Sequence, residues 1–218
     1  MKIGVVILAR TNFGRWPDKI LFELDGKPMF EWVIIKAMLL NLPVVVSTTK
    51  NIEDQIIVDT AERLGAIVSF GNPEDRNERN AQAIIENKFD YFVAISPAQP
   101  FFDLEYTENL INAIRKNPNN NYYTIGNGAS AVPNAFKSQA IIDNLDNKKR
   151  DQEVIINPHG MNGYRLYKWY EPELKNRFLF NYNIAFKIQA EVHRLICQHI
   201  GHFPRNYKEL RNALLEMD

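Results

Sequence analysis

Short, mostly apolar runs alternate with longer amphipathic segments over the first half of the chain. The first run, Lys2–Leu8, consists mostly of β-branched and aliphatic residues, and similar runs occupy Val44–Thr48, Ala66–Phe70 and Tyr91–Ser96. Continuous apolar runs of this length are typical of strands that are covered on both faces, as in a parallel sheet. We therefore predict a buried strand at each of these four places.

Helix-favouring segments separate the predicted strands. The first begins at Pro28, where a helix tolerates proline, and Pro43 and Gly65 follow the first two helices as stop signals. Strands that alternate with helices of this length predict βαβ units and an α/β fold with a mostly parallel sheet flanked by helices. The predicted helices are Pro28–Leu40, Ile52–Leu64, Asp75–Asn87 and Leu104–Lys116.

The regular alternation ends after Pro118. Residues Asn119–Gly128 are rich in Asn and Gly and predict turns, and residues 130–169 mix short apolar runs with polar loops. We expect extra strands or a small arm over the sheet at about 130–175, then C-terminal helices at about 184–216. A chain of 218 residues then forms one domain with an arm.

The charge balance excludes some classes of partner. The chain has 26 basic and 26 acidic residues, which argues against a nucleic-acid coat or a polybasic membrane anchor. Cys197 is the only cysteine, so an intrachain disulfide and a Cys-rich zinc site are excluded, and a reducing compartment is favoured. No segment approaches the roughly 18 apolar residues that span a bilayer, and the N-terminal run lacks the marks of a signal peptide. We therefore expect a cytoplasmic protein that binds neither membrane nor nucleic acid.

Three cations, Arg10, Arg15 and Lys19, fall in the loop between the first predicted strand and the first helix. Ligands of open α/β sheets bind beyond the carboxyl ends of the strands, and Arg and Lys bind phosphate oxygens, so a triphosphate is the candidate ligand. Gly14 allows close approach of the backbone, and Pro17 stiffens the loop. A solvated basic loop is the alternative, and the charges alone do not decide. The loop matches neither the P-loop nor the dinucleotide-binding pattern.

Two motifs in this region resemble those of a known family. The first combines Ala9-Arg10 with Arg15, Pro17 and Lys19, and the second is the turn Gly26-Lys27-Pro28-Met29. In this spacing they resemble the opening of bacterial cytidylyltransferases, both the spore-coat-polysaccharide type and CMP-3-deoxy-manno-octulosonate (CMP-Kdo) synthetase. The similarity continues more weakly to the C-terminus. Further matching positions are Val44–Thr48, Gly65, Gly71, Asp75 and Arg79.

The resemblance implies a Rossmann-like nucleotidyltransferase fold, a homodimer that pairs through the arm, and a reaction of CTP with a small sugar acceptor. CMP would move to a sugar or sugar acid with release of pyrophosphate, for surface-polysaccharide precursors. Arg10, Arg15 and Lys19 would then hold the triphosphate and stabilise the charge on the leaving group. Ser47 and Thr48 would lie near the cytosine and the ribose. The nucleotide-binding residues that the resemblance implies are Leu8, Ala9, Arg10, Gly14, Arg15, Lys19, Ser47, Thr48, Asp75, Arg79 and Ser96.

The resemblance also implies Mg²⁺, but the family's metal-holding positions differ in this chain. The family's Asp after the fourth strand aligns with Ala98, and its second carboxylate aligns with Asn181 or Asn183. Alanine offers a metal no oxygen, and an amide brings no charge. Mg²⁺ would then arrive with the nucleotide rather than on the protein.

Three carboxylates are candidate substitutes for the missing metal ligands. Asp103 and Glu105 follow the fourth predicted strand, and Glu153 stands where the family has a His in the arm. Asp103 is better explained as the N-cap of the next helix.

Two functions therefore stay open. The first is a cytidylyltransferase that uses the basic loop. The second is a catalytically degenerate member of the same fold that binds a nucleotide, a nucleotide sugar or a protein partner without turnover. A glycosyltransferase of related fold is a weaker third option, because the chain lacks the D-x-D motif that usually holds its metal.

Overall fold

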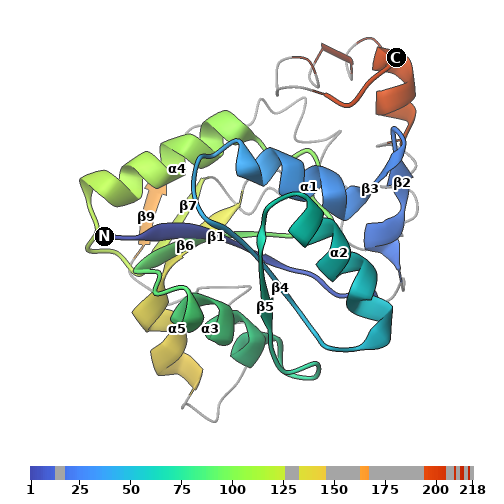
Figure 1. Ribbon diagram of the computed structural model, residues 1–218. Helices are drawn as coiled ribbons and strands as arrows, with labels where there is room; N and C mark the ends of the chain where they lie inside the picture. Colours follow the sequence, from blue (N-terminus) through green and yellow to red (C-terminus); the bar gives the residue numbers. More distant parts are fainter. Residues whose placement is uncertain are drawn as a thin grey trace.

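The computed structural model describes residues 1–12, 18–125, 133–145, 163–166, 194–204, 209, 212, 213 and 216. In this part of the chain, a seven-stranded sheet has the order β5-β4-β1-β6-β8-β7-β9 (Figure 1). The strands are β1 Ile3–Leu8, β4 Val44–Thr48, β5 Ile67–Phe70, β6 Tyr91–Ile95, β7 Tyr122–Ile125, β8 Asn134–Lys137 and β9 Gly163–Leu166.

The four predicted strands form the parallel centre of this sheet. Val5 of β1 lies opposite Val44 of β4 on one side and opposite Val93 of β6 on the other, and β5 extends the sheet beyond β4. Side chains of β1 and β4 are buried on both faces, which explains their unbroken apolar sequence. The predicted α/β fold with a mixed, mostly parallel sheet is confirmed.

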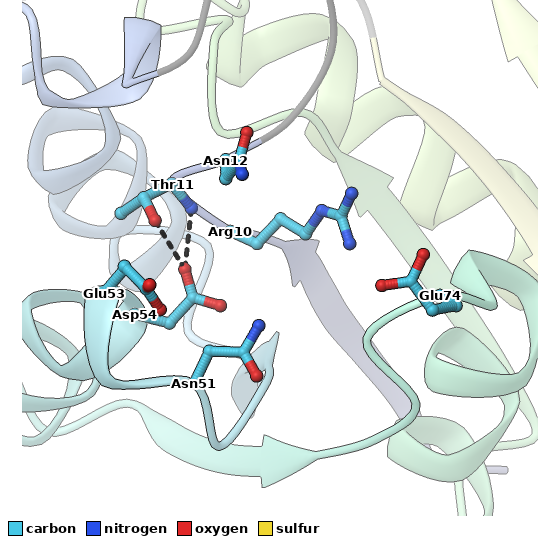
Figure 2. A pocket seen from close by; sticks show the side chains of 7 residues that line it. All are labelled: Arg10, Thr11, Asn12, Asn51, Glu53, Asp54 and Glu74. Atoms are coloured by element: carbon cyan, nitrogen blue, oxygen red, sulfur yellow. Dashed lines mark hydrogen bonds between the residues drawn. The ribbon is translucent and has the colours of Figure 1, made fainter.

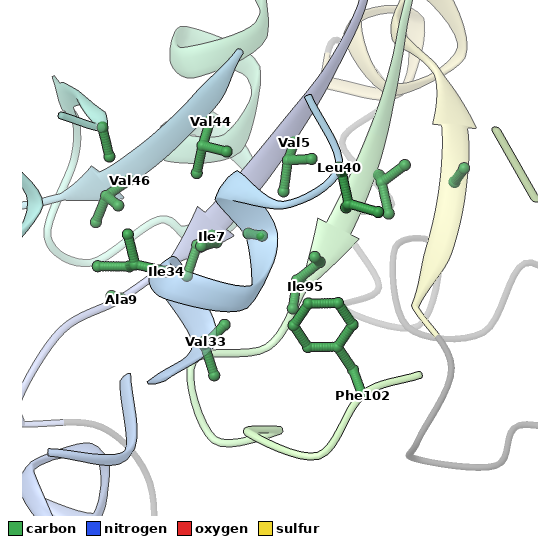
Figure 3. Packing of buried hydrophobic residues seen from close by; sticks show 14 of the residues in the cluster. Val5, Ile7, Ala9, Val33, Ile34, Leu40, Val44, Val46, Ile95 and Phe102 are labelled. Atoms are coloured by element: carbon green, nitrogen blue, oxygen red, sulfur yellow. The ribbon is translucent and has the colours of Figure 1, made fainter. Parts of the chain in front are cut away.

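Helices cover both faces of the sheet. Helices α1 (Met29–Met38), α2 (Gln55–Arg63) and α4 (Leu104–Lys116) lie on one face, and α3 (Arg76–Glu86) and α5 (Ser138–Leu145) lie on the other (Figure 1). A short 3₁₀ turn, η2 (Ile52–Asp54), leads into α2. Figure 3 shows the core under α1, where strand side chains and helix side chains meet. The residues labelled there are Val5, Ile7, Ala9, Val33, Ile34, Leu40, Val44, Val46, Ile95 and Phe102.

Glycine residues end two of the helices, and the stop at Gly65 was predicted. Gly65 follows α2 with a φ of 79°, the left-handed conformation that glycine adopts without strain. Residues 194–200 are helical, and Gly201 ends this helix with the same φ. The predicted bounds of α4 are also those observed.

One prediction for the region after Pro118 is wrong, and another is confirmed in part. Part of the predicted turn region is strand β7, because Tyr122–Ile125 is rich in β-favouring residues and pairs with β8 and β9. Strands β8 and β9 are among the extra strands expected in this region, whereas helix α5, which follows β8, was not predicted. Its buried Ile141 joins the apolar cluster between α3 and the sheet, which includes Phe136 of β8. The rest of the predicted arm, apart from β8 and β9, lies outside the described residues.

A hairpin that the sequence analysis did not predict precedes α1. Strands β2 (Glu23–Leu24) and β3 (Lys27–Pro28) are antiparallel, and the turn residues Asp25 and Gly26 have φ values of 45° and 72°. Two successive positive φ values are typical of the Asp-Gly hairpin turn. The hairpin forms part of a separate apolar cluster with Phe203 and Cys197.

The strand order directs attention to one edge of the sheet. From β1 the chain moves outward through β4 to β5, and it then returns through α3 to place β6 on the other side of β1. The carboxyl ends of β1 and β6 therefore lie side by side at a switch in strand order, where open α/β sheets bind ligands. In the described part of the chain, every helix is too short or too polar to cross a bilayer.

Candidate functional site

Asp54 fixes the start of the loop after β1. Its carboxylate is buried and accepts hydrogen bonds from the backbone N–H and the hydroxyl of Thr11, at 2.7 and 2.9 Å. The hydroxyl of Thr49 donates to the second carboxylate oxygen. The loops that follow β1 and β4 are thus tied together, and the backbone of Arg10, next to Thr11, is held in place.

Two guanidinium groups organise the loop between β5 and α3. Arg79 Nη1 donates to the carbonyl of Asn72 at 2.7 Å and lies 3.5 Å from the carbonyl of Pro73, to which Arg10 Nη1 also donates. Arg79 is only 2% exposed. Arg10 and Arg79 therefore meet at one carbonyl at the carboxyl edge of the sheet.

Gly71 permits this position of Arg79. A Cβ atom at Gly71 would lie 2.8 Å from Arg79 Cγ and 2.9 Å from Arg79 Cα. Real Cβ atoms do not approach other atoms so closely, so the end of β5 packs on α3 only with glycine at this position.

Asp75 begins α3 as its N-cap. Its side chain accepts hydrogen bonds from the backbone N–H groups of Asn77 and Glu78 at 2.9 and 3.0 Å. The structure therefore gives Asp75 a capping role. The predicted contact of Asp75 with a nucleotide stays a prediction.

Four cations gather where the β1 loop meets α3, namely Arg10, Lys19, Arg76 and Arg79. Burial, and then the charges of Arg10 and Arg76, lower the pKa of Arg79. Burial, followed by Arg76, lowers the pKa of Lys19, and burial lowers that of Arg76. Cations held together in partly dry surroundings repel one another, so an anion bound among them would be strongly favoured. The structure thus brings together three of the predicted residues, whereas Gly14 and Arg15 lie outside the described residues.

Arg76 was missed by the sequence analysis. It occupies the first turn of α3, directly after the N-cap Asp75. A helix that crosses from one parallel strand to the next begins at the carboxyl edge of the sheet, so a cation in its first turn lies near the ligand edge. That position was the available signal.

Ser47 and Thr48 at the end of β4 have fully buried side chains. The Ser47 hydroxyl donates to the carbonyl of Arg79 at 3.1 Å, and the Thr48 hydroxyl has no hydrogen-bond partner in the described structure. Ala9 and Gly71 donate their backbone N–H groups to the carbonyls of Ser47 and Thr48. The Ser47 side chain therefore bonds within the fold, and the predicted contact of Ser47 and Thr48 with cytosine and ribose stays a prediction.

The turn after β6 is uncharged. Ser96 Oγ accepts a hydrogen bond from the N–H of Ala98 at 3.3 Å, and Gln99 Oε1 lies 3.4 Å from the N–H of Ser96. The half-buried Ala98 packs against two apolar clusters. The side chains of this turn therefore offer a divalent cation amide and hydroxyl oxygens but no carboxylate.

Asp103 caps α4, as the sequence analysis favoured. Its side chain accepts from the N–H of Tyr106 at 2.9 Å, and the residue is 4% exposed. Burial raises the pKa of this carboxyl group, an effect that Lys36 opposes. Among the described residues, no group of three or more His, Cys, Asp or Glu side chains is arranged to hold a metal ion. Asn181, Asn183 and Glu153 lie outside the described residues.

A polar pocket opens beside Arg10 (Figure 2). Its guanidinium extends across the pocket, and the Glu74 carboxylate faces it from the opposite side. The hydrogen bonds from Thr11 to Asp54 lie at one end of the pocket. Such a pocket offers both donors and acceptors to a polar ligand, next to the cations that suit a phosphate group. The lining residues are Arg10, Thr11, Asn12, Asn51, Glu53, Asp54 and Glu74.

Comparison with known proteins identifies relatives of this chain. A family model described as cytidylyltransferase matches residues 4–199. A 3-deoxy-manno-octulosonate cytidylyltransferase of Colwellia psychrerythraea is 29% identical over 151 residues, which are 65% of this chain and 53% of the relative. Another, of Francisella tularensis subsp. novicida, is 26% identical over 176 residues, 76% of this chain and 61% of the relative. This chain thus spans little more than half the length of these curated relatives.

Solved structures share the fold over nearly the whole chain. A cytidylyltransferase of Leptospira borgpetersenii serovar Hardjo-bovis aligns with a TM-score of 0.80 at 18% identity, covering 100% of this chain and 95% of the other. The CMP:2-keto-3-deoxy-manno-octonic acid synthetase complexed with CTP aligns with a TM-score of 0.63 at 15% identity, covering 91% and 99%. The predicted nucleotidyltransferase fold is therefore confirmed.

Proposed function

Since this chain belongs to the cytidylyltransferase family, we propose that it transfers CMP from CTP to a sugar or sugar acid and releases pyrophosphate, in the synthesis of surface-polysaccharide precursors. The cluster of Arg10, Lys19, Arg76 and Arg79 at the carboxyl edge carries this proposal. The relatives that act on 3-deoxy-manno-octulosonate make sugar acids the first acceptors to test.

In the proposed reaction the cations stabilise negative charge on the phosphates. An oxygen of the acceptor forms a bond to the α-phosphorus of CTP, and the bond from that phosphorus to the oxygen that bridges it to the β-phosphorus breaks. Negative charge builds up on the departing pyrophosphate. Arg10, Lys19 and Arg76 would hold the triphosphate in line and stabilise that charge, which is the main protein contribution to phosphoryl transfer.

Binding without turnover is the second candidate function. The uncharged turn at Ala98 and Gln99 favours it, because family members use Mg²⁺ with CTP and this turn offers the metal no carboxylate. The proposed homodimer does not distinguish the two candidates.

An assay of pyrophosphate release tests the proposal. CTP, UTP, ATP and GTP would each be combined with a panel of sugar acids that includes 3-deoxy-manno-octulosonate. We expect release with CTP alone, and a loss of about a hundredfold in kcat/KM for Lys19→Ala, the usual effect of removing one donor to a developing negative charge. Lys116→Ala is the matched control, because Lys116 is exposed at the far end of α4.

The outcomes separate the two candidate functions. Turnover that Lys19→Ala leaves intact contradicts the assigned role of the cations. CTP binding by calorimetry without release on any acceptor supports the degenerate member. If no nucleotide binds, the cytidylyltransferase proposal is wrong.

A further inference from the structure

The two sides of the candidate site differ in the charge that they can offer a metal-bound nucleotide. On the β6 side, Ser96, Ala98 and Gln99 are neutral, and the Ala98 methyl group belongs to the apolar packing. The nearby carboxylate of Asp103 is already bonded to the start of α4. Among the described residues of this side, no group of three or more His, Cys, Asp or Glu side chains is arranged to hold a divalent cation.

On the β1 and α3 side four cations gather, and Arg79 in particular is held in place. Arg79 is 2% exposed and anchored by two backbone carbonyls, and Gly71 packs directly on it. Arg10 shares the Pro73 carbonyl with Arg79, and Lys19 and Arg76 are close enough to affect each other electrostatically. Cations brought together before a ligand arrives give an anion its countercharge without further rearrangement.

Acidic residues nearby do not replace the missing metal ligands. Three hydrogen bonds from Thr11 and Thr49 use the carboxylate of Asp54, which is 2% exposed. Asp75 caps α3 with its side chain. Glu53 and Glu74 are exposed, and they line the polar pocket at opposite ends, with Arg10 between them.

We infer that this chain neutralises the triphosphate of its nucleotide with its own cations and binds CTP without a divalent metal ion. The inference rests on the proposed function and names the charge that this particular chain supplies at that site. Mg²⁺ and the guanidinium groups would compete for the same phosphate oxygens. Addition of Mg²⁺ therefore does not strengthen binding in the way expected of a protein-held metal.

Calorimetry of CTP binding in EDTA and in excess Mg²⁺ tests the inference. For the unmodified chain, we expect the two dissociation constants to agree within about tenfold. A difference of that size is smaller than the contribution of one strong charge-assisted hydrogen bond to binding. Arg76→Ala should weaken binding in EDTA by about tenfold or more, and by less in Mg²⁺, because the metal ion then supplies part of the lost charge. The matched control is Arg115→Ala, an exposed arginine on α4, which should bind as the unmodified chain does.

A second measurement uses the metal alone. Mn²⁺, whose free form has a distinct paramagnetic resonance signal, would be titrated into the full chain without nucleotide. We expect the free signal to be the same with and without protein. Retention of Mn²⁺ by the chain, or CTP binding that appears only with Mg²⁺, overturns the inference and leaves the proposed function standing. Absence of CTP binding in both buffers also overturns the proposed function.

Discussion

Two buried cations on opposite faces of the same sheet differ in the charges that surround them. Lys36 of α1 donates to the carbonyl of Phe102 at 2.7 Å, lies 4.9 Å from the centre of the Phe102 ring, and has Asp103 nearby to stabilise its charge. Arg79 of α3 also has carbonyl partners, but two of its charged neighbours are the cations Arg10 and Arg76.

The difference separates a structural cation from a ligand-directed one. The partners of Lys36 partly compensate for the burial of its charge, so its ammonium group has stabilising contacts within the fold and needs no ligand. Asp54 and Asp75 favour the charged form of Arg79, as Asp103 does for Lys36. The like charges of Arg10 and Arg76, however, disfavour the charged form of Arg79, and an anion bound among these cations would offset that repulsion. Burial alone does not mark a functional cation. The charge of its neighbours does.

The largest expected effect comes from removing the Arg79 charge. Arg79→Met keeps much of the side-chain volume but removes a buried charge, the donor to the Asn72 carbonyl and one of the two donors to the Pro73 carbonyl. We expect the dissociation constant of CTP to rise by about a hundredfold, because loss of one buried charged partner commonly has an effect of this size. Calorimetry measures it. Lys36→Met is the matched variant, and a comparable loss of affinity there would break the distinction between the two cations.

Gly71→Ala tests the packing that positions Arg79. The added methyl group would overlap with Arg79 Cγ and Cα, so the end of β5 must move away from α3. We expect a loss of about 2 kcal/mol in the free energy of unfolding, as for other overpacked sites, together with weaker CTP binding. Denaturant unfolding and calorimetry measure the two effects.

Gly26→Ala is the control for the glycine substitution. Unlike Gly71, Gly26 has a positive φ, of 72°, and nothing lies within 4 Å of the added Cβ. This variant should lose stability by about 1 kcal/mol through backbone strain alone and should bind CTP normally. If Gly26→Ala also lost affinity, the contact between Gly71 and Arg79 would not be the cause.

Asn80 shows a second sign of incomplete satisfaction around Arg79. It is 0% exposed, and both polar atoms of its amide have no hydrogen-bond partner in the described structure. Because an unmatched buried polar group destabilises a fold, Asn80→Leu should raise the free energy of unfolding by about 1.5 kcal/mol.

The matched control for Asn80 lies in α4. Thr107 is equally buried, but its hydroxyl donates to the carbonyl of Asp103. Thr107→Val should therefore lower the free energy of unfolding by about 1 kcal/mol, the opposite sign. Chemical denaturation of both variants measures the two changes in the free energy of unfolding. A destabilised Asn80→Leu protein would show that the buried Asn80 amide is not an unsatisfied polar group.

Much of the fold could be predicted because its signals are local. The parallel strands are continuous apolar runs, Gly65 marks the end of α2, and Asp75 and Asp103 cap the helices that they precede. Strand β7 was missed because its flanking Asn residues favour turns, whereas pairing with β8 decides its conformation. The turn of the β2–β3 hairpin did carry a local signal, Asp25-Gly26.

The candidate site was predictable only in part, since it is assembled from distant segments. Arg10 and Lys19 were identified in one loop, and the resemblance added Arg79. In the sequence, Arg76 is an ordinary residue of a first helical turn. Only the crossover from β5 to β6 in the fold brings it near Lys19. The roles of Ser47 and Asp75 illustrate the reverse, because their side chains bond within the fold. Sequence patterns thus located the edge of the sheet better than they assigned each side chain.

The smallest expected effect is a pH dependence that Lys36 has and Arg79 lacks. Burial lowers the pKa of Lys36 to about 8, whereas an unfolded lysine keeps the usual value of 10.5. Above pH 8 the unfolded chain therefore binds more protons than the folded one, and stability rises with pH until the unfolded lysine also titrates. Between pH 8 and 9 the gain is about 1 kcal/mol.

Comparison with a variant isolates this contribution. Cys197 and Tyr91 have pKa values raised to about 12 by burial, so they oppose the gain only above about pH 9 and 10, where their unfolded forms lose protons. Denaturant unfolding at pH 8 and 9 should show the gain in the unmodified chain and its loss in Lys36→Met. Arg79→Met should keep it, because a guanidinium stays charged throughout this range. If Lys36→Met kept the gain as well, Lys36 would not be the charged group whose burial the fold has to compensate, and the comparison with Arg79 would lose one of its two members.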